Sequence, residues 1–333
     1  MKLSYSFIIP VYNRPDEIDE LLQSFTELAF LESYEIVIVE DGSSLKADKV
    51  VQSYNEKLDI SYYDKPNSGP GDSRNFGMQH AKGNYFIILD SDCILPKHYL
   101  SEVDTFLQQN YVDCFGGPDA AHDSFTDLQK AINYVMTSFL TTGGIRGRKH
   151  SLHKFEPRSF NMGLSKDAFL KTQGFGKIHP GEDPDLTQRI WKSGFQSAFI
   201  EKAFVYHKRR ISWKKFHQQV RKFGLVRPIL LTWHPTSRKI SFWFPTLFVA
   251  YHLLSLISLF FGYWQFIALL AIYLLIVFLD AIRSTKSLRI AVAVLFAVYI
   301  QFFGYGVAFF KSTVAIRLCG LQPQKAYPEL FFK

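Results

Sequence analysis

Residues 85–92 read YFIILDSD, and both the fold and the candidate chemistry of this chain follow from this stretch. The apolar run from Tyr85 to Leu89 has the length and composition of a buried β-strand. Two acids, Asp90 and Asp92, follow at once, and an extended chain points residues two apart to the same side. The stretch therefore predicts a buried strand that ends in a pair of carboxylates.

Short β-type runs and segments with helical spacing alternate ahead of this strand, in the order 6–11, 15–29, 35–39, 46–57, 60–63 and 73–81. Such alternation predicts an α/β fold with a parallel, doubly wound, Rossmann-like sheet. Ligands bind beyond the carboxyl ends of the strands in these sheets, and Tyr12, Asp41 and the two later acids follow three of the predicted strands. The sequence has neither GxGxxG after its first strand nor GxxxxGK[ST], which argues against a dinucleotide oxidoreductase and a P-loop ATPase.

The composition is sufficient for a hydrophobic core and is basic overall. Of 333 residues, 47% are hydrophobic, and the formal net charge is +8. A basic surplus suits nucleic acid, an anionic membrane surface or a phosphorylated substrate. The three cysteines show no CxxC spacing and are expected to be free thiols in a reducing compartment. We interpret the first apolar stretch, which Pro10 interrupts, as a strand rather than a secretory signal.

Three long apolar runs, at residues 242–261, 264–282 and 290–310, follow the soluble-type sequence. A membrane-spanning helix needs about 20 mostly apolar residues, so the runs predict two or three transmembrane helices within residues 241–311. The alternative is a set of buried helices in a globular domain. Aromatic residues at the run ends, Trp243, Tyr263 and Trp264, are typical of the membrane interface.

Basic residues flank these runs at Arg238, Lys239, Arg283, Lys286 and Arg289. The positive-inside rule then predicts an integral protein of the cell membrane, with its N-terminal half and the 283–289 loop in the cytoplasm. Three crossings conflict with the same rule, because they put the basic tail at residues 312–333 outside. Either the third run is re-entrant or interfacial, or the tail is an exception.

Residues 207–240, ahead of the first run, are expected to form a basic amphipathic region on the membrane surface. Trp213, Phe216, Val220 and Phe223 recur there at helical spacing among basic residues. An ordinary solvated basic helix is the alternative. Nucleic acid is not expected as a partner, because the basic stretch adjoins the membrane segments.

The acid pair has two interpretations when taken alone. Two unpaired carboxylates on one side repel, and a hard cation such as Mg²⁺ or Mn²⁺ removes the repulsion while keeping positions open for substrate phosphates. Asp-Ser-Asp is equally typical of a turn or a helix cap. The pattern alone therefore leaves a metal site and a structural turn both open.

Wider sequence context favours the metal site, because several segments together resemble a family-two inverting glycosyltransferase of the A-type fold. They match in order and spacing: FIIPVYNRPDEIDELLQSF, EIVIVEDGSS, GPGDSRNFGMQHAKGNYFIILDSD, FNMGLSKDAFLKTQGF and GEDPDLTQRIWKSGF. The resemblance covers roughly residues 4–225 and implies a nucleotide-sugar glycosyltransferase domain at residues 1–225.

The resemblance implies donor-binding roles for Pro10, Tyr12, Asp41, Arg74 and Asp90. Tyr12 offers a stacking face, and Asp41 can accept an N–H from a uracil-like base. Alternatively, Asp41 is a turn residue of Asp-Gly, and Arg74 is a surface charge on a helix.

The resemblance also implies a metal site of Asp90, Asp92 and His207, with Asp92 as the first choice of ligand. A neutral histidine at a strand end is the alternative for His207. Glu182 and Asp183 match the catalytic acid pair of the family, with Asp183 as general base and Glu182 orienting it. Two acids also suit an ordinary helix N-terminus.

The expected function is metal-dependent, inverting transfer of a hexose-type sugar from a nucleotide-diphosphate donor, most simply a UDP-sugar, to a hydroxyl of a lipid-linked glycan. The Gln-x-x-Arg-Trp segment of processive relatives is not found near residues 218–223, which favours single-sugar transfer. A glycine- and arginine-containing loop at residues 143–148 is interpreted as a lid or as a surface loop. Alternatives are transfer to polyprenyl phosphate, a sugar-phosphate nucleotidyltransferase and a non-catalytic nucleotide-binding membrane protein.

Overall fold

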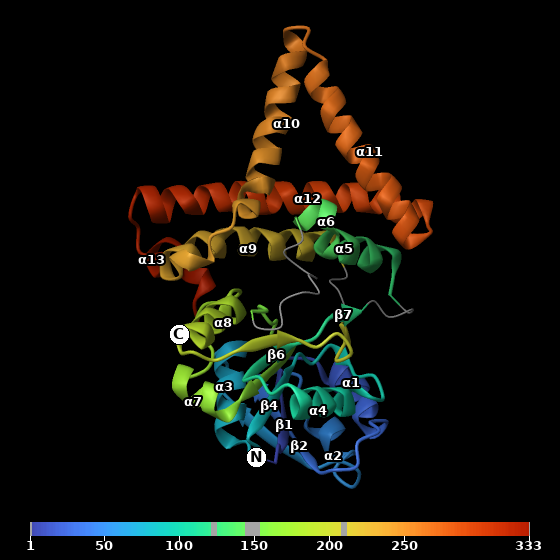
Figure 1. Cartoon of the computed structure of the whole chain (residues 1–333), viewed down its shortest axis with the longest axis vertical. Coiled ribbons are helices and arrows are strands. Elements are labelled where there is room, and N and C mark those ends of the chain that lie inside the picture. Colours follow the sequence, from blue (N-terminus) through green and yellow to red (C-terminus); the bar gives the residue numbers. More distant parts are fainter. Residues whose placement is uncertain (1, 121–124, 144–153, 208–211, 333) are drawn as a thin grey trace. The chain divides into compact units, whose positions relative to one another are not determined.

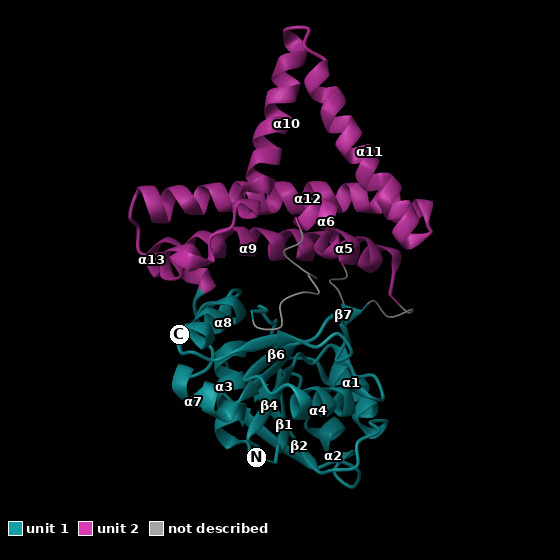
Figure 2. Ribbon diagram, viewed as in Figure 1, with its two compact units in different colours: residues 1–122, 149–207, 331–333 teal, residues 123–148, 208–330 magenta. Residues whose placement is uncertain are grey.

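The computed structural model of the chain describes residues 2–120, 125–143, 154–207 and 212–332 (Figure 1). It divides into two compact units (Figure 2). Unit 1 comprises residues 1–122, 149–207 and 331–333, and unit 2 comprises residues 123–148 and 208–330. Both units are therefore built from segments that are not contiguous in sequence.

Unit 1 is built on a seven-stranded sheet in the order β3-β2-β1-β4-β8-β6-β9. Its strands are β1 (Tyr5–Val11), β2 (Tyr34–Asp41), β3 (Ile60–Lys65), β4 (Tyr85–Leu89), β6 (Cys114–Gly116), β8 (Asn161–Ser165) and β9 (Ser197–Phe199). The first four are mutually parallel, as predicted. The sheet as a whole is mixed, because β8 runs antiparallel to both β4 and β6. Residues 123–148, which belong to unit 2, separate β6 from β8 in the sequence.

Helices cover both faces of this sheet: α1 (Pro15–Thr26), α2 (Asp48–Gln52), α3 (Pro70–His80), α4 (Tyr99–Gln109), α7 (Lys166–Thr172) and α8 (Glu182–Lys192). Successive strand residues face opposite sides. In β1, Phe7 packs into the core under α1 and α4, whereas Ile8 packs into the core under α3, α7 and α8. The doubly wound α/β architecture predicted from the sequence is confirmed.

A small second sheet carries part of the candidate site. It consists of β5 (Cys93–Ile94), β10 (Val205–His207) and β7 (Asp119–Ala120), with β10 in the middle. The antiparallel register of β5 and β10 pairs Cys93 with His207. His207, the last residue of the 149–207 segment of unit 1, thus lies beside Cys93 in the segment that follows β4.

Unit 2 is helical: α5 (Asp127–Thr137), α6 (Phe139–Thr142), α9 (Trp213–Trp233), α10 (Phe244–Phe260), α11 (Gln265–Thr285), α12 (Leu288–Thr313) and α13 (Pro323–Ala326), with shorter turns at Pro235–Ser237, Ile240–Trp243, Val314–Leu318 and Pro328–Leu330. Three helical stretches are long and apolar enough to cross a membrane: Ile240–Phe260, Gln265–Thr285 and Leu288–Leu318. Within unit 2, α10 and α11 form a hairpin that extends away from a layer formed by α9 and α12 (Figure 1).

The basic segment ahead of the first apolar helix forms α9, and its first predicted residues, 208–211, lie outside the described part of the chain. Phe216 and Val220 are buried, whereas Lys214, Lys215 and Arg221 are exposed. The helix is therefore amphipathic. Its apolar face packs in the same core as α12.

Candidate active site

Tyr12 and Asp41, two of the predicted donor-binding residues, lie at the carboxyl ends of neighbouring strands. Val11 pairs with Glu40 and Asp41 pairs with Lys65, so the ends of β1, β2 and β3 are side by side. Tyr12 follows β1 directly, and its side chain is 53% exposed. Its ring is thus available for stacking, whereas Pro10 lies within β1.

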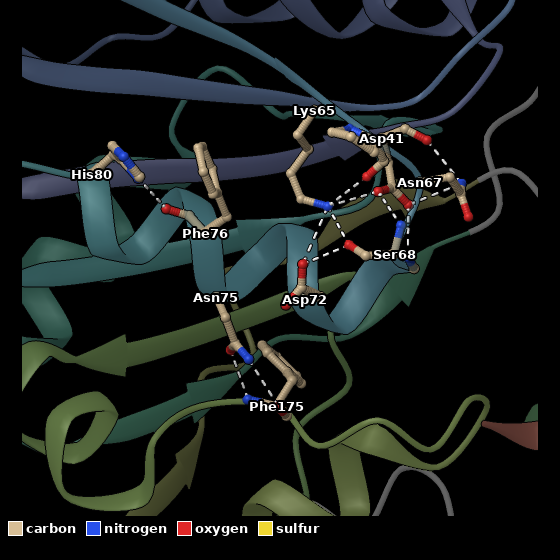
Figure 3. A network of polar contacts seen from close by, with 11 residues as sticks. Asp41, Lys65, Asn67, Ser68, Asp72, Asn75, Phe76, His80 and Phe175 are labelled. Carbon is tan, nitrogen blue, oxygen red and sulfur yellow. Dashed lines mark hydrogen bonds and ion pairs between the residues drawn. The ribbon is translucent and has the colours of Figure 1, made fainter. Parts of the chain in front are cut away.

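Asp41 holds the loop that leads into α3 (Figure 3). Its Oδ1 accepts hydrogen bonds from Lys65 Nζ and the Ser68 backbone N–H, both at 2.9 Å. Its Oδ2 accepts from the Gly69 backbone N–H at 2.9 Å and from Asn67 Nδ2 at 3.2 Å. A carboxylate has about four acceptor sites, so the protein itself uses all of them.

This geometry modifies the sequence-based hypothesis for Asp41. An N–H of a nucleoside base must replace one of the four donors, or Asp41 must act by shaping the loop. Lys65, which was not anticipated, also lies 3.2 Å from Asp72 Oδ2. Lys65 ends the third strand, and the neighbouring strand ends in Asp41. These positions could have predicted the ion pair from the sequence.

The two acids after β4 lie in a turn. The backbone N–H of Cys93 donates to the Asp90 carbonyl at 3.2 Å, which closes this turn. The chain is therefore not extended from Asp90 to Asp92, and the argument that both carboxylates point to one side does not apply. Asp90 Oδ1 accepts from Arg74 at 2.7 Å, whereas Asp92 Oδ2 accepts from Arg14 at 2.9 Å.

Arg74 connects the segment after β4 with the predicted catalytic acids. Its guanidinium is buried and donates to Asp90 and, at 3.2 Å, to Glu182 Oε1. It also lies 5.2 Å from the centre of the Phe175 ring. The alternative interpretation of Arg74 as a surface charge is thus wrong.

The donor set around Asp92 fits a divalent cation. Ligand atoms of Asp92, Cys93 and His207 lie within 4.8 Å of one another. His207 Nε2 is 3.2 Å from Asp92 Oδ1, a buried oxygen that accepts no hydrogen bond of good geometry within the described residues. One carboxylate and one imidazole suit Mn²⁺.

Electrostatics distinguish the members of this cluster. Burial disfavours the Asp92 carboxylate, yet His207 and Arg14 hold its pKa well below the ordinary range. Burial raises the pKa of the Cys93 thiol well above its ordinary value, so Cys93 stays protonated and is a poor ligand. Asp92 and His207 are therefore the candidate ligands, and Asp90 lies outside this cluster.

Glu182 and Asp183 open α8 and have opposite electrostatic environments. Glu182 is buried, and its Oε1 lies 2.9 Å from His179 Nδ1 and 3.2 Å from Arg74. Despite burial, these partners lower the pKa of Glu182 to about 2. Burial and the adjacent Glu182 charge raise the pKa of Asp183 to about 6, against the opposing effects of Arg158 and Arg74. The pair thus combines a permanently ionised acid with one that titrates near neutral pH.

Two further residues of this region were not anticipated from the sequence. Arg14 pairs with Asp92, and His179 pairs with Glu182. Arg14 follows the first strand, and His179 comes three residues before Glu182, so both positions carried a signal. The predicted lid loop at residues 143–148 falls mostly outside the described residues.

The last described residues of the chain also belong to unit 1. Phe331 forms a β-bridge with Ile178, and the Phe332 N–H donates to the Lys177 carbonyl at 3.0 Å. The Phe332 ring lies 5.8 Å from the His179 ring. A Cβ on Gly69 would come within 2.4 Å of the same ring. The tail thus contacts both the Asp41 loop and the segment that carries His179.

Comparison with known proteins finds a family model that matches the N-terminal part of the chain. Residues 6–170 match the family model described as glycosyl transferase family 2. Over 114 residues the chain is 31% identical to the poly(ribitol-phosphate) β-N-acetylglucosaminyltransferase TarS of Staphylococcus aureus, a match that covers 33% of this chain and 20% of that relative. The chain therefore covers only about a fifth of that relative's length.

Two solved structures share the fold. The mannosyltransferase PcManGT from Pyrobaculum calidifontis, in complex with GDP-Man and Mn²⁺, has a TM-score of 0.66 at 15% identity, covering 91% of this chain and 88% of that one. TarS 1-349 of S. aureus in complex with UDP-GlcNAc has a TM-score of 0.50 at 17% identity, covering 93% and 91%. These likenesses confirm the A-type glycosyltransferase fold predicted from the sequence. The chain therefore contains a glycosyl transferase family 2 domain, which the family model matches over residues 6–170.

Proposed function

We propose that this chain transfers one sugar from a nucleotide-diphosphate donor to a hydroxyl group of a lipid-linked glycan, with inversion of the anomeric carbon. The observation that carries the proposal is the contrast between Asp183 and Glu182. A hydroxyl acceptor needs a base, and a base is most effective when its pKa lies near the working pH. Asp183, with a pKa of about 6, meets this requirement.

Glu182 has a positioning role in this proposal. Its charge, held by His179 and Arg74, keeps the pKa of Asp183 high. It therefore helps to tune the neighbouring base without taking the acceptor proton itself. An anionic polyprenyl phosphate needs no base and is repelled by two adjacent acids, which makes a hydroxyl the better acceptor.

The donor is proposed to bind across the carboxyl ends of β1, β2 and β4. Tyr12 stacks on the base, Pro10 and the Asp41 loop form the nucleoside site, and Arg74 with Asp90 supports the diphosphate side. GDP-Man and UDP-GlcNAc occupy the two related structures, so both nucleotides suit the fold. We propose a UDP-sugar of the hexose type, since the sequence relative is named as an N-acetylglucosaminyltransferase.

Asp92 and His207 are proposed to hold Mg²⁺ or Mn²⁺, with Arg14 on the other oxygen of Asp92. When bound, the ion neutralises charge that develops on the leaving diphosphate. Asp90 was expected to ligate the metal as well. Its contact with Arg74 favours a role on the donor side instead.

The acceptor and location are proposed from the apolar helices. Three helices long enough to span a membrane support an integral protein of the cell membrane. Basic residues on either side of α10 and α11 support a cytoplasmic catalytic unit. A lipid-linked glycan presents its hydroxyls at such a surface.

A panel of sugar nucleotides tests the function with purified, detergent-solubilised protein, a divalent metal and a membrane-lipid extract as acceptor. Transfer of label to lipid is expected for one donor, and Asp183→Asn should reduce it about 10²–10⁴-fold while nucleotide binding is kept. Asp167→Asn, an exposed acid in the first turn of α7, is the matched control and should keep full activity. Undiminished transfer by Asp183→Asn would contradict the assignment. Release of pyrophosphate from a sugar phosphate and a nucleoside triphosphate would indicate a nucleotidyltransferase instead.

A further inference from the structure

The chain leaves unit 1 after His207 and returns to it at Phe331. The return is made by hydrogen bonds within unit 1, where Phe331 bridges to Ile178 and Phe332 donates to the Lys177 carbonyl. A chain that starts and ends in one folded unit crosses a membrane an even number of times. Among the described residues, three helices between these points are long enough to cross. At least one of them therefore does not.

Helix α12 differs from the other two in its surroundings. Within the most apolar window of each helix, 44% of the residues of α12 are buried in the protein, against 17% in α10 and in α11. Of the three helices, α12 therefore leaves the smallest share of its residues open to lipid. α12 is thus the candidate for the helix that does not cross.

Its packing partner is the basic helix α9, side by side with it (Figure 2). A Cβ on Gly224 would meet the Tyr305 carbonyl oxygen at 2.4 Å, and a Cβ on Gly304 would meet Val220 at 2.8 Å. Ser312 Oγ also donates to the Leu225 carbonyl at 2.7 Å. The two backbones are therefore in close contact over residues 220–225 and 304–312. When the protein is bound to a membrane, this part of α12 lies at the same depth in the bilayer as α9.

That depth is incompatible with the hydrocarbon core. Exposed Lys214, Lys215 and Arg221 lie along α9, and an exposed cation is strongly disfavoured near the bilayer centre. The exposed apolar side chains of α12 follow one stripe at helical spacing: Leu288, Val292, Phe296, Val307 and Phe310. One apolar stripe beside a basic face is typical of a helix lying in the membrane interface.

Helices α10 and α11 have the opposite character. Exposed Leu253, Leu254, Leu256 and Ile257 lie around α10 rather than on one side. The connection between the helices, residues 261–264, carries no charge, whereas Arg283 lies in the last turn of α11 and Lys286 follows that helix. Each of the two apolar stretches has 21 residues, which at about 1.5 Å per residue matches the bilayer core.

We infer that α10 and α11 form a two-pass hairpin in the bilayer, while α12 lies in the interface on the side of unit 1, its exposed stripe contacting lipid. This inference rests on the proposed membrane location. It also removes the conflict between three crossings and the positive-inside rule. With two crossings, the 283–289 segment and the basic tail lie on the same side of the membrane as the catalytic unit. Only the uncharged turn at residues 261–264 reaches the far side.

Labelling with a membrane-impermeant maleimide tests the inference in right-side-out vesicles that contain the full chain. Cys319 is exposed and reports on the tail, whereas Cys93 and Cys114 are buried. Leu31→Cys, Tyr263→Cys and Ser284→Cys, each on a Cys319→Ser background, report on unit 1, the hairpin tip and the last turn of α11. Only Tyr263→Cys should react before detergent is added, and all four positions should react afterwards.

Labelling of Cys319 before detergent, with Leu31→Cys protected, would overturn the inference in favour of three crossings. Protection of Tyr263→Cys together with the other positions would overturn it by excluding the hairpin. Reaction of Leu31→Cys and Cys319, with Tyr263→Cys protected, would support the hairpin but contradict the proposed cytoplasmic orientation. Release of the protein by alkaline carbonate would contradict the membrane proposal itself, and sugar transfer assayed on the same vesicles reports on the function separately.

The contact between Phe331 and Ile178, on which the even number of membrane crossings rests, has its own test. Ile178→Cys with Phe331→Cys, on the Cys319→Ser background, should form a disulfide in vesicles under mild oxidation, because the two residues are bridge partners. Leu31→Cys with Phe331→Cys is the control and should not cross-link. Failure of the first pair to cross-link would contradict the return of the tail to unit 1.

Discussion

Arg74 and Glu182, 108 residues apart in sequence, form a buried ion pair with 3.2 Å between Nη1 and Oε1. The same guanidinium holds Asp90 at 2.7 Å. One side chain of α3 thus connects the segment after β4 with the start of α8. The geometry of the proposed donor and base sites therefore depends on Arg74. We expect this side chain to contact neither the anomeric carbon of the donor nor the acceptor hydroxyl.

Replacing Arg74 should lower the stability of the protein. In Arg74→Met, Glu182 and Asp90 lose their shared partner, and breaking a buried pair typically costs about 3–5 kcal/mol. The melting temperature of the solubilised protein should fall by several degrees. The double variant Arg74→Met/Glu182→Gln should recover part of that loss, because it leaves no unpaired charge at position 182. Equal losses in the single and double variants would indicate that the pair contributes little.

The activity should depend on pH through Asp183. Its pKa is raised above the ordinary value, so the carboxylate is protonated and inactive below about pH 6 and ionised above it. The value of kcat/KM should rise with pH, reach half its plateau near pH 6 and be roughly a tenth of the plateau at pH 5. Glu182→Gln removes the charge that raises this pKa, so the midpoint should move to lower pH. A midpoint that does not move would contradict the coupling of the two acids.

Metal dependence should change at Asp92 and His207. Chelation is expected to abolish transfer, and added Mn²⁺ should restore it. His207→Ala should raise the Mn²⁺ concentration needed for half-maximal activity by roughly tenfold or more, since an imidazole ligand is lost. His98→Ala, an exposed histidine before α4, is the control and should leave the Mn²⁺ titration unchanged. Full activity in chelator would exclude a metal role for this cluster.

Asp41 should control nucleotide binding through the loop at residues 66–69. In Asp41→Asn, an amide nitrogen faces backbone N–H groups that now donate to a carboxylate oxygen, so the loop loses bonds it cannot replace. The dissociation constant for UDP, measured by calorimetry, should rise about tenfold or more. Asp64→Asn changes an exposed acid paired with Lys46 at the end of the neighbouring strand and should bind UDP normally. Normal binding by Asp41→Asn would show that the loop does not need the carboxylate.

Local patterns were sufficient for much of unit 1. The strand predicted at residues 85–89 has those bounds in the structure, because an apolar run between turn residues is buried on both faces of the sheet. The helix predicted at residues 15–29 ends earlier, at Thr26, and the one predicted at 46–57 is only Asp48–Gln52. Helix ends depend on caps and tertiary contacts that periodicity does not encode.

Long-range relationships could not be read from the sequence. After Leu89 the chain turns, and Asp90 pairs with Arg74 while Asp92 pairs with Arg14, whereas the family resemblance implied one metal site that contains both acids. The direction of β8 and the return of Phe331 to unit 1 depend on where the chain re-enters that unit. These features are set by packing between segments that are far apart in the chain. Hydrophobic periodicity describes only neighbouring residues and therefore cannot predict them.

The stereochemistry of a single turnover tests the central claim most directly. The purified protein is incubated with an α-linked UDP-sugar that it accepts and with a soluble analogue of its acceptor, and the anomeric proton of the product is followed by NMR. In-line displacement with Asp183 as base predicts a β-linked product and a loss of at least about 10²-fold in rate for Asp183→Asn. An α-linked product, or a β-linked product formed at the same rate by Asp183→Asn, would contradict it.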